Sequence, residues 1–251
     1  MLGCDGFLDE ARNPMDRLGE LVAMTPRLLA ILASAAALAA CHAQARPVVV
    51  ELFQSQGCSS CPPANANLAK VADRPDVIAL SYSVTYWDGL GWKDTFAQPK
   101  FTSRQWDYAH ALRHTDVFTP QVVVDGRRDG VGADPADFAR LVGAAGAPAP
   151  GPSITLAGNQ VTIAAGPKPA APADVWLARY DPRILNVPVR GGENGGRTLP
   201  HKDIVRELIR IGGWTGAAET LTLPAPTQTG LKTAILVQSA KTGPILAAVK
   251  D

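Results

Sequence analysis

The chain has 251 residues, of which 46% are hydrophobic, and its formal net charge at pH 7 is +1. This length is enough for one large domain or two modest domains with a hydrophobic core. The near balance of charge argues against a nucleic-acid-binding protein, which would carry an excess of lysine and arginine.

Residues 24–45 have the pattern of a signal peptide that begins at a methionine. Arg27 supplies positive charge near its start, and residues 28–40 form an apolar run of 13 residues, which is too short to span a membrane. The Ala-Gln-Ala sequence at 43–45 has the small residues of a cleavage site. We therefore expect a secreted or periplasmic protein, and we interpret residues 1–23 as an extension upstream of the true start.

The same leader leaves a second interpretation open. Leu38-Ala39-Ala40-Cys41 resembles a bacterial lipobox, in which the cysteine is lipidated and becomes the first residue of the mature protein. Contact with a membrane is expected only in that case. Under either interpretation, the mature chain leaves the cytosol and reaches a compartment where disulfides persist.

Two cysteines follow the first predicted strand. The β-branched and apolar residues at 48–53 favour a buried strand, Gly57 permits a tight turn, and the prolines at 62–63 suit the first turn of a helix. Cys58 and Cys61 then lie at the N-terminus of that helix, where free N–H groups and the helix dipole stabilise a thiolate. This order predicts a redox-active pair in a thioredoxin-like domain, with Cys58 as the more exposed and more acidic cysteine.

Residues 77–84 predict a second buried strand, and a right-handed helical crossover would make it the parallel neighbour of the first. The loop after it, residues 86–94, is rich in aromatic residues and glycine. Trp87 and Trp92 in this loop have two interpretations that the sequence leaves open. They are either the filler of a packed loop or one wall of a substrate groove beside the cysteines, because α/β sites form where strands end.

A proline precedes the next β-branched run. Pro120 stands before residues 121–124, and a proline within a strand removes a ladder hydrogen bond. We predict a cis Thr119–Pro120 bond that places the Thr119 backbone within van der Waals reach of the two sulfurs, where it presents the substrate backbone. An ordinary trans proline at the start of a strand is the alternative. Asp125-Gly126 then predicts a hairpin turn.

Glu51 is the one charged residue of the first predicted strand, and it precedes Cys58 by seven residues. A carboxylate buried beneath the cysteines would have a raised pKa and would accept the proton of Cys61 during exchange. The alternative is that Glu51 points to the outer face of the sheet, away from the cysteines.

The second half of the chain has a different pattern. Residues 147–152 are rich in alanine, glycine and proline, and we interpret them as a linker. Residues 153–251 contain short runs of alternating apolar and polar residues, with a hairpin signal at Gly158-Asn159. We therefore expect an α/β fold, with a thioredoxin-like domain at 46–146 followed by a smaller β-rich, sandwich-like domain at 153–251.

Five short motifs are similar to those of a known family. They are Glu51-Leu52-Phe53, the Cys-x-x-Cys region 55–63, residues 86–88 with 91–94, residues 119–126, and residues 193–201. In these motifs the chain resembles the secreted bacterial family called domain of unknown function 1223, from about Val48 to the C-terminus. The resemblance implies a thioredoxin-like domain followed by a β-rich one, but it supplies no activity.

The pattern favours a periplasmic thiol–disulfide oxidoreductase. Cys58 would attack, Cys61 would resolve, Glu51 would accept the proton, and Pro120 would help to present the substrate. Two alternatives stay open: a non-catalytic thioredoxin-like binding module with a structural disulfide, and a copper-handling protein that binds copper(I) through its thiolates. The expected partners are thiols or disulfides of proteins or peptides. The sequence predicts no nucleic-acid partner, no cofactor and, outside the copper alternative, no metal site.

Overall fold

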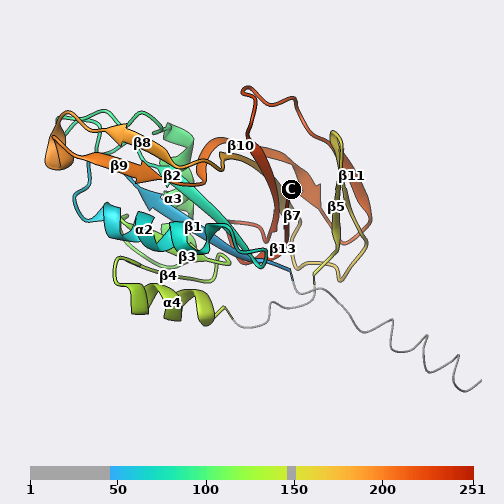
Figure 1. Cartoon of the computed structure of the whole chain (residues 1–251). Coiled ribbons are helices and arrows are strands. Elements are labelled where there is room, and N and C mark those ends of the chain that lie inside the picture. The colour runs from blue at the N-terminus through green and yellow to red at the C-terminus, as the bar shows by residue number, and fades with distance from the viewer. Residues whose placement is uncertain (1–45, 146–150) are drawn as a thin grey trace, which may run out of the picture. The chain divides into compact units, whose positions relative to one another are not determined.

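The computed structural model describes residues 46–145 and 151–251 (Figure 1). The predicted leader, with Cys41, and most of the predicted linker at 147–152 lie outside the described residues. No helix in the two described ranges is long and apolar enough to cross a membrane. These two ranges fold together as one unit.

The unit is built on one mixed sheet of eight strands, whose spatial order is β13-β12-β7-β10-β2-β1-β3-β4. The strands are β1 (Val48–Gln54), β2 (Val77–Ser83), β3 (Gln121–Val124), β4 (Arg128–Gly130), β7 (Ala173–Asp181), β10 (Ile204–Trp214), β12 (Lys232–Gln238) and β13 (Ile245–Lys250). β1 and β2 are parallel neighbours, as predicted, and β3 pairs antiparallel with the other edge of β1. β1 is thus an interior strand, which explains its largely apolar sequence.

The predicted fold class, a thioredoxin-like domain followed by a separate β-rich domain, is wrong. The C-terminal strands β7, β10, β12 and β13 extend the same sheet that contains β1 to β4. β10 joins β2 in parallel, with Ile204 opposite Ser81, and the Ser81 N–H donates to the Asp203 carbonyl at 2.9 Å. The physical reason is the edge of β2, which is buried along its whole length and without β10 would expose unpaired backbone groups. The fold is a large mixed sheet with few helices.

Helices cover both faces of the sheet around β1 (Figure 1). They are α2 (Cys61–Ala72), α3 (Pro99–Ala111) and α4 (Pro135–Gly143). Because side chains alternate along a strand, Leu52 packs with residues of α2 and α4, whereas Phe53 packs with residues of α3. The cluster around Phe53 also contains Tyr180 of β7 and Leu236 of β12. One hydrophobic core therefore runs through both halves of the chain.

Two smaller sheets complete the unit. They consist of β5 (Ile154–Ala157), β6 (Gln160–Ile163) and β11 (Glu219–Thr222) in the first, and β8 (Leu185–Pro188) and β9 (Thr198–His201) in the second. The first sheet packs Val161 and Ile163 against Trp214 and Val237 of the large sheet. In the second, β9 contacts α2, and the 3-10 turn η2 (Gly192–Asn194) lies in the β8–β9 connection. This hairpin brings a distant part of the chain to the helix that begins at Cys61.

Candidate functional site

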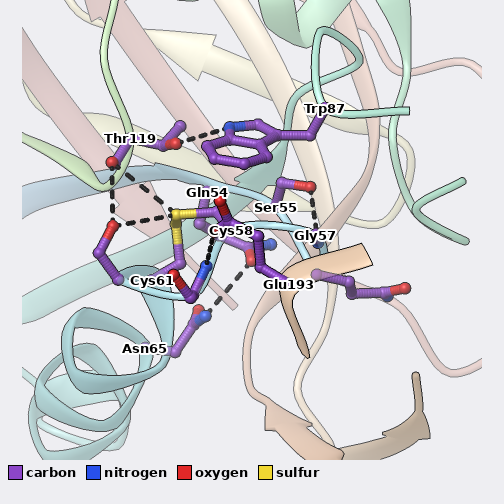
Figure 2. Close-up of a disulfide and its surroundings, with 12 residues drawn as sticks. Gln54, Ser55, Gly57, Cys58, Cys61, Asn65, Trp87, Thr119 and Glu193 are labelled. Atoms are coloured by element: carbon purple, nitrogen blue, oxygen red, sulfur yellow. Dashed lines mark hydrogen bonds between the residues drawn. A yellow bond between two sulfur atoms is a disulfide. The ribbon is translucent and has the colours of Figure 1, made fainter. Parts of the chain in front are cut away.

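The two predicted cysteines form a disulfide at the start of α2 (Figure 2). Cys61 is the first residue of the helix, Ser60 is its N-cap residue, and Pro62 lies in its first turn. The Cys58 N–H donates to the Ser55 carbonyl and the Cys61 N–H to the Cys58 carbonyl, both at 3.2 Å. The Cα atoms of the two cysteines are 5.5 Å apart. The chain leaving β1 therefore forms a tight hydrogen-bonded turn immediately before the helix.

The Thr119–Pro120 bond is cis, as predicted. The Thr119 carbonyl oxygen lies 3.8 Å from the Cys58 Sγ, which confirms the predicted closeness of this backbone to one of the two sulfurs. Ser60 Oγ lies between these groups, 3.2 Å from the Sγ and 3.4 Å from the carbonyl oxygen. Trp87 donates its indole N–H to Thr119 Oγ1 at 2.8 Å, and Figure 2 shows both residues on the same side of the disulfide. The Cys58 sulfur therefore faces a backbone carbonyl and a hydroxyl.

Both cysteines are buried, with 0% of each residue exposed. The prediction that Cys58 is the more exposed of the two is therefore wrong. Thr119 contacts the Cys58 sulfur, and Gly57 lies against the Trp87 side chain, since a Cβ placed on Gly57 would be 3.5 Å from the Trp87 Cβ. A partner that reaches the Cys58 sulfur must first displace some of these neighbours.

Asn194, from the β8–β9 connection, binds the turn before α2. It is fully buried, and its side-chain amide donates to the carbonyl oxygens of Gln56 at 3.0 Å and Cys58 at 2.8 Å. Arg197 in turn donates to the Asn194 side-chain oxygen at 2.5 Å. Both amide protons and the amide oxygen of Asn194 are thus used, so the residue fixes the β8–β9 connection to the turn that carries Cys58.

Two carboxylates bind backbone N–H groups of the same turn. The Asp94 carboxylate accepts the Gln56 N–H at 2.7 Å, and the Glu193 carboxylate accepts the Ser59 N–H at 3.0 Å. Burial raises the pKa of Asp94, whereas hydrogen bonds from Ser59 lower the pKa of Glu193. Within the described residues, neither carboxylate forms an ion pair with lysine or arginine. The Glu193 carboxylate therefore places a negative charge beside the turn.

The two predicted tryptophans both lie near this turn, in different positions. Trp92 donates its indole N–H to Gln56 Oε1 at 2.9 Å, and Gln56 Nε2 donates to Thr95 Oγ1 at 2.9 Å. Trp87 instead contacts Thr119, as described above. The loop after β2 thus contributes one tryptophan to the Thr119 side of the disulfide and one to the support of the turn.

Glu51 has a different environment from the predicted one. Its carboxylate accepts two hydrogen bonds from Arg104, at 2.7 and 3.1 Å, and one from the Tyr108 hydroxyl. Gln238 of β12 is within hydrogen-bond distance of Arg104 at 3.2 Å and of the Tyr108 hydroxyl at 2.9 Å. All four side chains are buried. No hydrogen bond in the described part of the chain joins Glu51 to either cysteine, so its role as their proton acceptor stays a prediction.

The sequence did not predict Asp94, Glu193 or Asn194 as site residues. A signal was present, because residues 91–94 and 193–201 are among the motifs that carry the family resemblance. Their contacts could not be predicted, because they lie 38 to 138 residues from their partners in the sequence.

The chemistry open to this group of residues is that of the disulfide itself. A thiolate can attack either sulfur and open the bond, and a cysteine thiolate formed there would lie at a helix N-terminus. Among the described residues, no cluster of three or more histidine, cysteine, aspartate or glutamate side chains is arranged to hold a metal ion.

The chain matches the model of the family described as protein of unknown function DUF1223 over residues 49–238. It is also similar to an X-ray crystal structure of a protein from Agrobacterium tumefaciens, with 34% sequence identity and a TM-score of 0.68. That match covers 82% of this chain and 94% of the other. None of the curated proteins compared with the chain matches it. The chain belongs to the DUF1223 family.

Proposed function

We propose that this protein carries out thiol–disulfide exchange through the Cys58–Cys61 pair, outside the cytosol. The observation that carries the proposal is the position of the pair: Cys61 opens α2, and the Cys58 sulfur lies 3.8 Å from the Thr119 carbonyl oxygen. A thiolate at a helix N-terminus is stabilised by the helix dipole and free N–H groups. The leader pattern at 24–45 supports a compartment in which disulfides persist.

The proposed reaction proceeds in two exchange steps. The Cys58 thiolate of the reduced protein attacks one sulfur of a substrate disulfide and forms a mixed disulfide, while the other substrate sulfur leaves as a thiolate and takes up a proton. The Cys61 thiolate then attacks the Cys58 sulfur, re-forms the Cys58–Cys61 bond and releases the second substrate thiolate. Two electrons pass from the protein to the substrate, and the same steps run in reverse with a substrate dithiol.

An extended peptide segment is the substrate that suits this surface. The Thr119 backbone lies beside the Cys58 sulfur, where an extended chain can pair as an added strand. Tyr86 and Leu90, before and after Trp87 in the sequence, are 39% and 62% exposed and offer apolar surface to substrate side chains. We therefore propose protein or peptide disulfides and thiols as the partners.

The burial of both sulfurs requires the site to open during exchange. The same burial favours a second candidate function, in which the disulfide is structural and the protein is a non-catalytic binding module. The two functions differ in whether Cys58 forms covalent adducts with other proteins.

Trapping of mixed disulfides tests the proposed function. In the Cys61→Ser variant, Cys58 can form an adduct that no second cysteine resolves, whereas in the Cys58→Ser variant the attacking group is missing. We expect Cys61→Ser to accumulate mixed disulfides with proteins of the compartment in which it is expressed, and Cys58→Ser to form few. The adducts are detected on non-reducing gels and identified by mass spectrometry. If neither variant forms adducts, the structural-disulfide function replaces the proposed one.

A further inference from the structure

Among residues 46–145 and 151–251, the acids beside the disulfide have no cationic partner. Glu193 binds the N–H of Ser59, a residue that lies between the two cysteines in the sequence, and Asp94 binds the N–H of Gln56. Neither acid is paired with lysine or arginine in the described ranges. The Glu193 charge is therefore held one residue away from Cys58, without neutralisation by a nearby cation.

We propose that Glu193 favours the disulfide form of the pair by disfavouring a thiolate at Cys58, which makes the reduced pair a strong electron donor. The disulfide carries no charge, whereas a Cys58 thiolate is an anion on the residue before Ser59, whose N–H the Glu193 carboxylate binds, and like charges repel. The inference rests on the proposed thiol–disulfide function for its biological meaning. The effect of the Glu193 charge on the cysteines can be measured without a substrate.

The Glu193 carboxylate and a Cys58 thiolate would also both be stabilised by the partial positive charge at the N-terminus of α2. The N-terminus of α2 stabilises a nearby anion through its dipole and its free N–H groups. Glu193 already occupies the Ser59 N–H, which lies just before this N-terminus. The same hydrogen bonding lowers the pKa of Glu193, so the carboxylate is ionised at neutral pH.

The neighbouring residues hold Glu193 in this position. Asn194 is fully buried and is bonded to the carbonyls of Gln56 and Cys58, which fixes the β8–β9 connection to the turn. Gly192, on the other side, has a φ of +65°, a conformation that favours glycine, and a Cβ there would lie 3.2 Å from the Trp92 Cβ. Glu193 itself is exposed, so replacing its carboxylate leaves this buried frame in place.

The charge gives the exchange a direction. Because the dithiol form is destabilised relative to the disulfide form, the reduced pair passes two electrons to the disulfide of a substrate protein. The substrate is then released as a dithiol. An external protein dithiol of lower reduction potential must then return two electrons to the Cys58–Cys61 bond and is itself oxidised to a disulfide. The substrate class is therefore protein disulfides, and the protein acts as a reductant toward them.

The test compares Glu193→Gln with Glu219→Gln in the full chain. Both variants remove one exposed carboxylate, but Glu219 lies in β11, outside the turn and the β8–β9 connection. The first measurement is the pH dependence of alkylation of Cys58 in the reduced protein, with each cysteine followed by mass spectrometry. The second is the equilibrium constant for reduction of the disulfide by glutathione at pH 7.

The pH profile includes contributions from the other charged groups near the site. These are Asp94 and, behind it, Asp88, which accepts the Asp94 N–H, together with Arg197 beside Asn194 and Asp116 near Tyr86. All of them are unchanged between the wild type and Glu193→Gln. A difference between these two profiles therefore reports the charge of Glu193.

We expect the alkylation midpoint of Glu193→Gln to shift to lower pH and its equilibrium constant for reduction to rise by about threefold to tenfold, with both changes smaller in 1 M salt. Glu219→Gln should match the wild type. Unchanged values in Glu193→Gln, or equal shifts in the two variants, overturn the inference. A selective shift in a protein whose Cys61→Ser variant traps no adducts upholds the electrostatic role and rejects the proposed function. Trapped adducts without a shift in Glu193→Gln uphold the proposed function and reject the electrostatic role of Glu193.

Discussion

Negative charge is accommodated differently at two neighbouring sites, one within β1 and one in the turn that follows it. Glu51, in the middle of β1, is buried and is bonded to the Arg104 guanidinium and the Tyr108 hydroxyl. Glu193, at the turn, is exposed and binds a backbone N–H. The Glu51 carboxylate is stabilised by a cation because desolvation is costly, whereas the Glu193 carboxylate is stabilised by water. Of these two acids, only Glu193 is left without a cation beside the turn that carries Cys58.

The largest effect is expected from breaking the interior pair. Arg104→Gln leaves the Glu51 carboxylate buried without a cation, and we expect it to lower the free energy of unfolding by about 3–5 kcal/mol. Urea unfolding followed by circular dichroism measures this change. Arg140→Gln is the matched control, because the Arg140 side chain is 76% exposed in its ion pair with Asp137, and a change within about 0.5 kcal/mol is expected there.

Equal and small losses in the two variants would contradict the assignment of Glu51 to the interior pair. Arg104 also lies over the rings of Tyr108 and Trp176, at 5.0 and 5.4 Å from their centroids. The Glu51→Gln variant keeps these contacts and removes the carboxylate. If Glu51 serves only the interior pair, Glu51→Gln loses stability but exchanges thiols at the wild-type rate when folded.

A smaller effect is expected from loosening the turn. Asn194→Ala removes the donors to the carbonyls of Gln56 and Cys58 and should cost about 1–3 kcal/mol of unfolding free energy. It should also speed the reduction of the disulfide by dithiothreitol, because the turn that carries Cys58 loses its anchor. Asn186→Ala, at an exposed position of β8 in the same hairpin, should change neither quantity. A wild-type reduction rate in Asn194→Ala would show that other residues limit access.

The pH dependence of stability sharpens the comparison between buried and exposed charge. Burial lowers the pKa of His201 to about 4 and raises the pKa of Asp203 to about 7. The contribution of His201 is present above its ordinary pKa of 6.5 and is lost as pH falls through 4, whereas that of Asp203 is present below 3.8 and is lost as pH rises through 7. Between pH 4 and 6.5 the two contributions oppose each other.

Asp203→Asn removes one of these opposing contributions. The unfolding free energy of this variant should therefore rise more steeply with pH between 4 and 6.5 than that of the wild type, by up to about 1.4 kcal/mol per pH unit, the slope that one bound proton produces. Urea unfolding at a series of pH values measures the slope. Because the Asp203 backbone has a φ of +52°, which asparagine tolerates, the substitution preserves the local conformation. Parallel curves for the two proteins would show that Asp203 does not titrate in this range.

The local features of the fold and the site could be predicted from the sequence. Several of these features depend on residues that are close in the chain: the Cys58–Cys61 disulfide, the cis Thr119–Pro120 bond, and the hairpins at Asp125-Gly126 and Gly158-Asn159. The parallel pairing of β1 with β2 was predicted from the helical crossover that connects them. Each of these predictions concerns a geometry that a few adjacent residues impose.

The remaining features depend on contacts between distant segments. Nothing in the alternating pattern of β10 indicates that it pairs with β2 rather than within a separate sheet. Similarly, a lone glutamate in an apolar strand does not reveal whether a cysteine or an arginine lies opposite, and Arg104 follows Glu51 by 53 residues. Asn194 is 136 residues from Cys58, in a polar connection whose sequence resembles an ordinary loop.

Redox activity of the folded Cys58–Cys61 pair is tested most directly by its equilibrium with glutathione. The purified protein is brought to equilibrium in buffers of graded glutathione ratio, once from the disulfide and once from the dithiol, and the thiol fraction is measured by mass spectrometry after alkylation. We predict the same two-electron titration curve from both directions while the circular dichroism spectrum stays native. A disulfide that stays closed until the protein unfolds would contradict it and would identify Cys58–Cys61 as a structural bond.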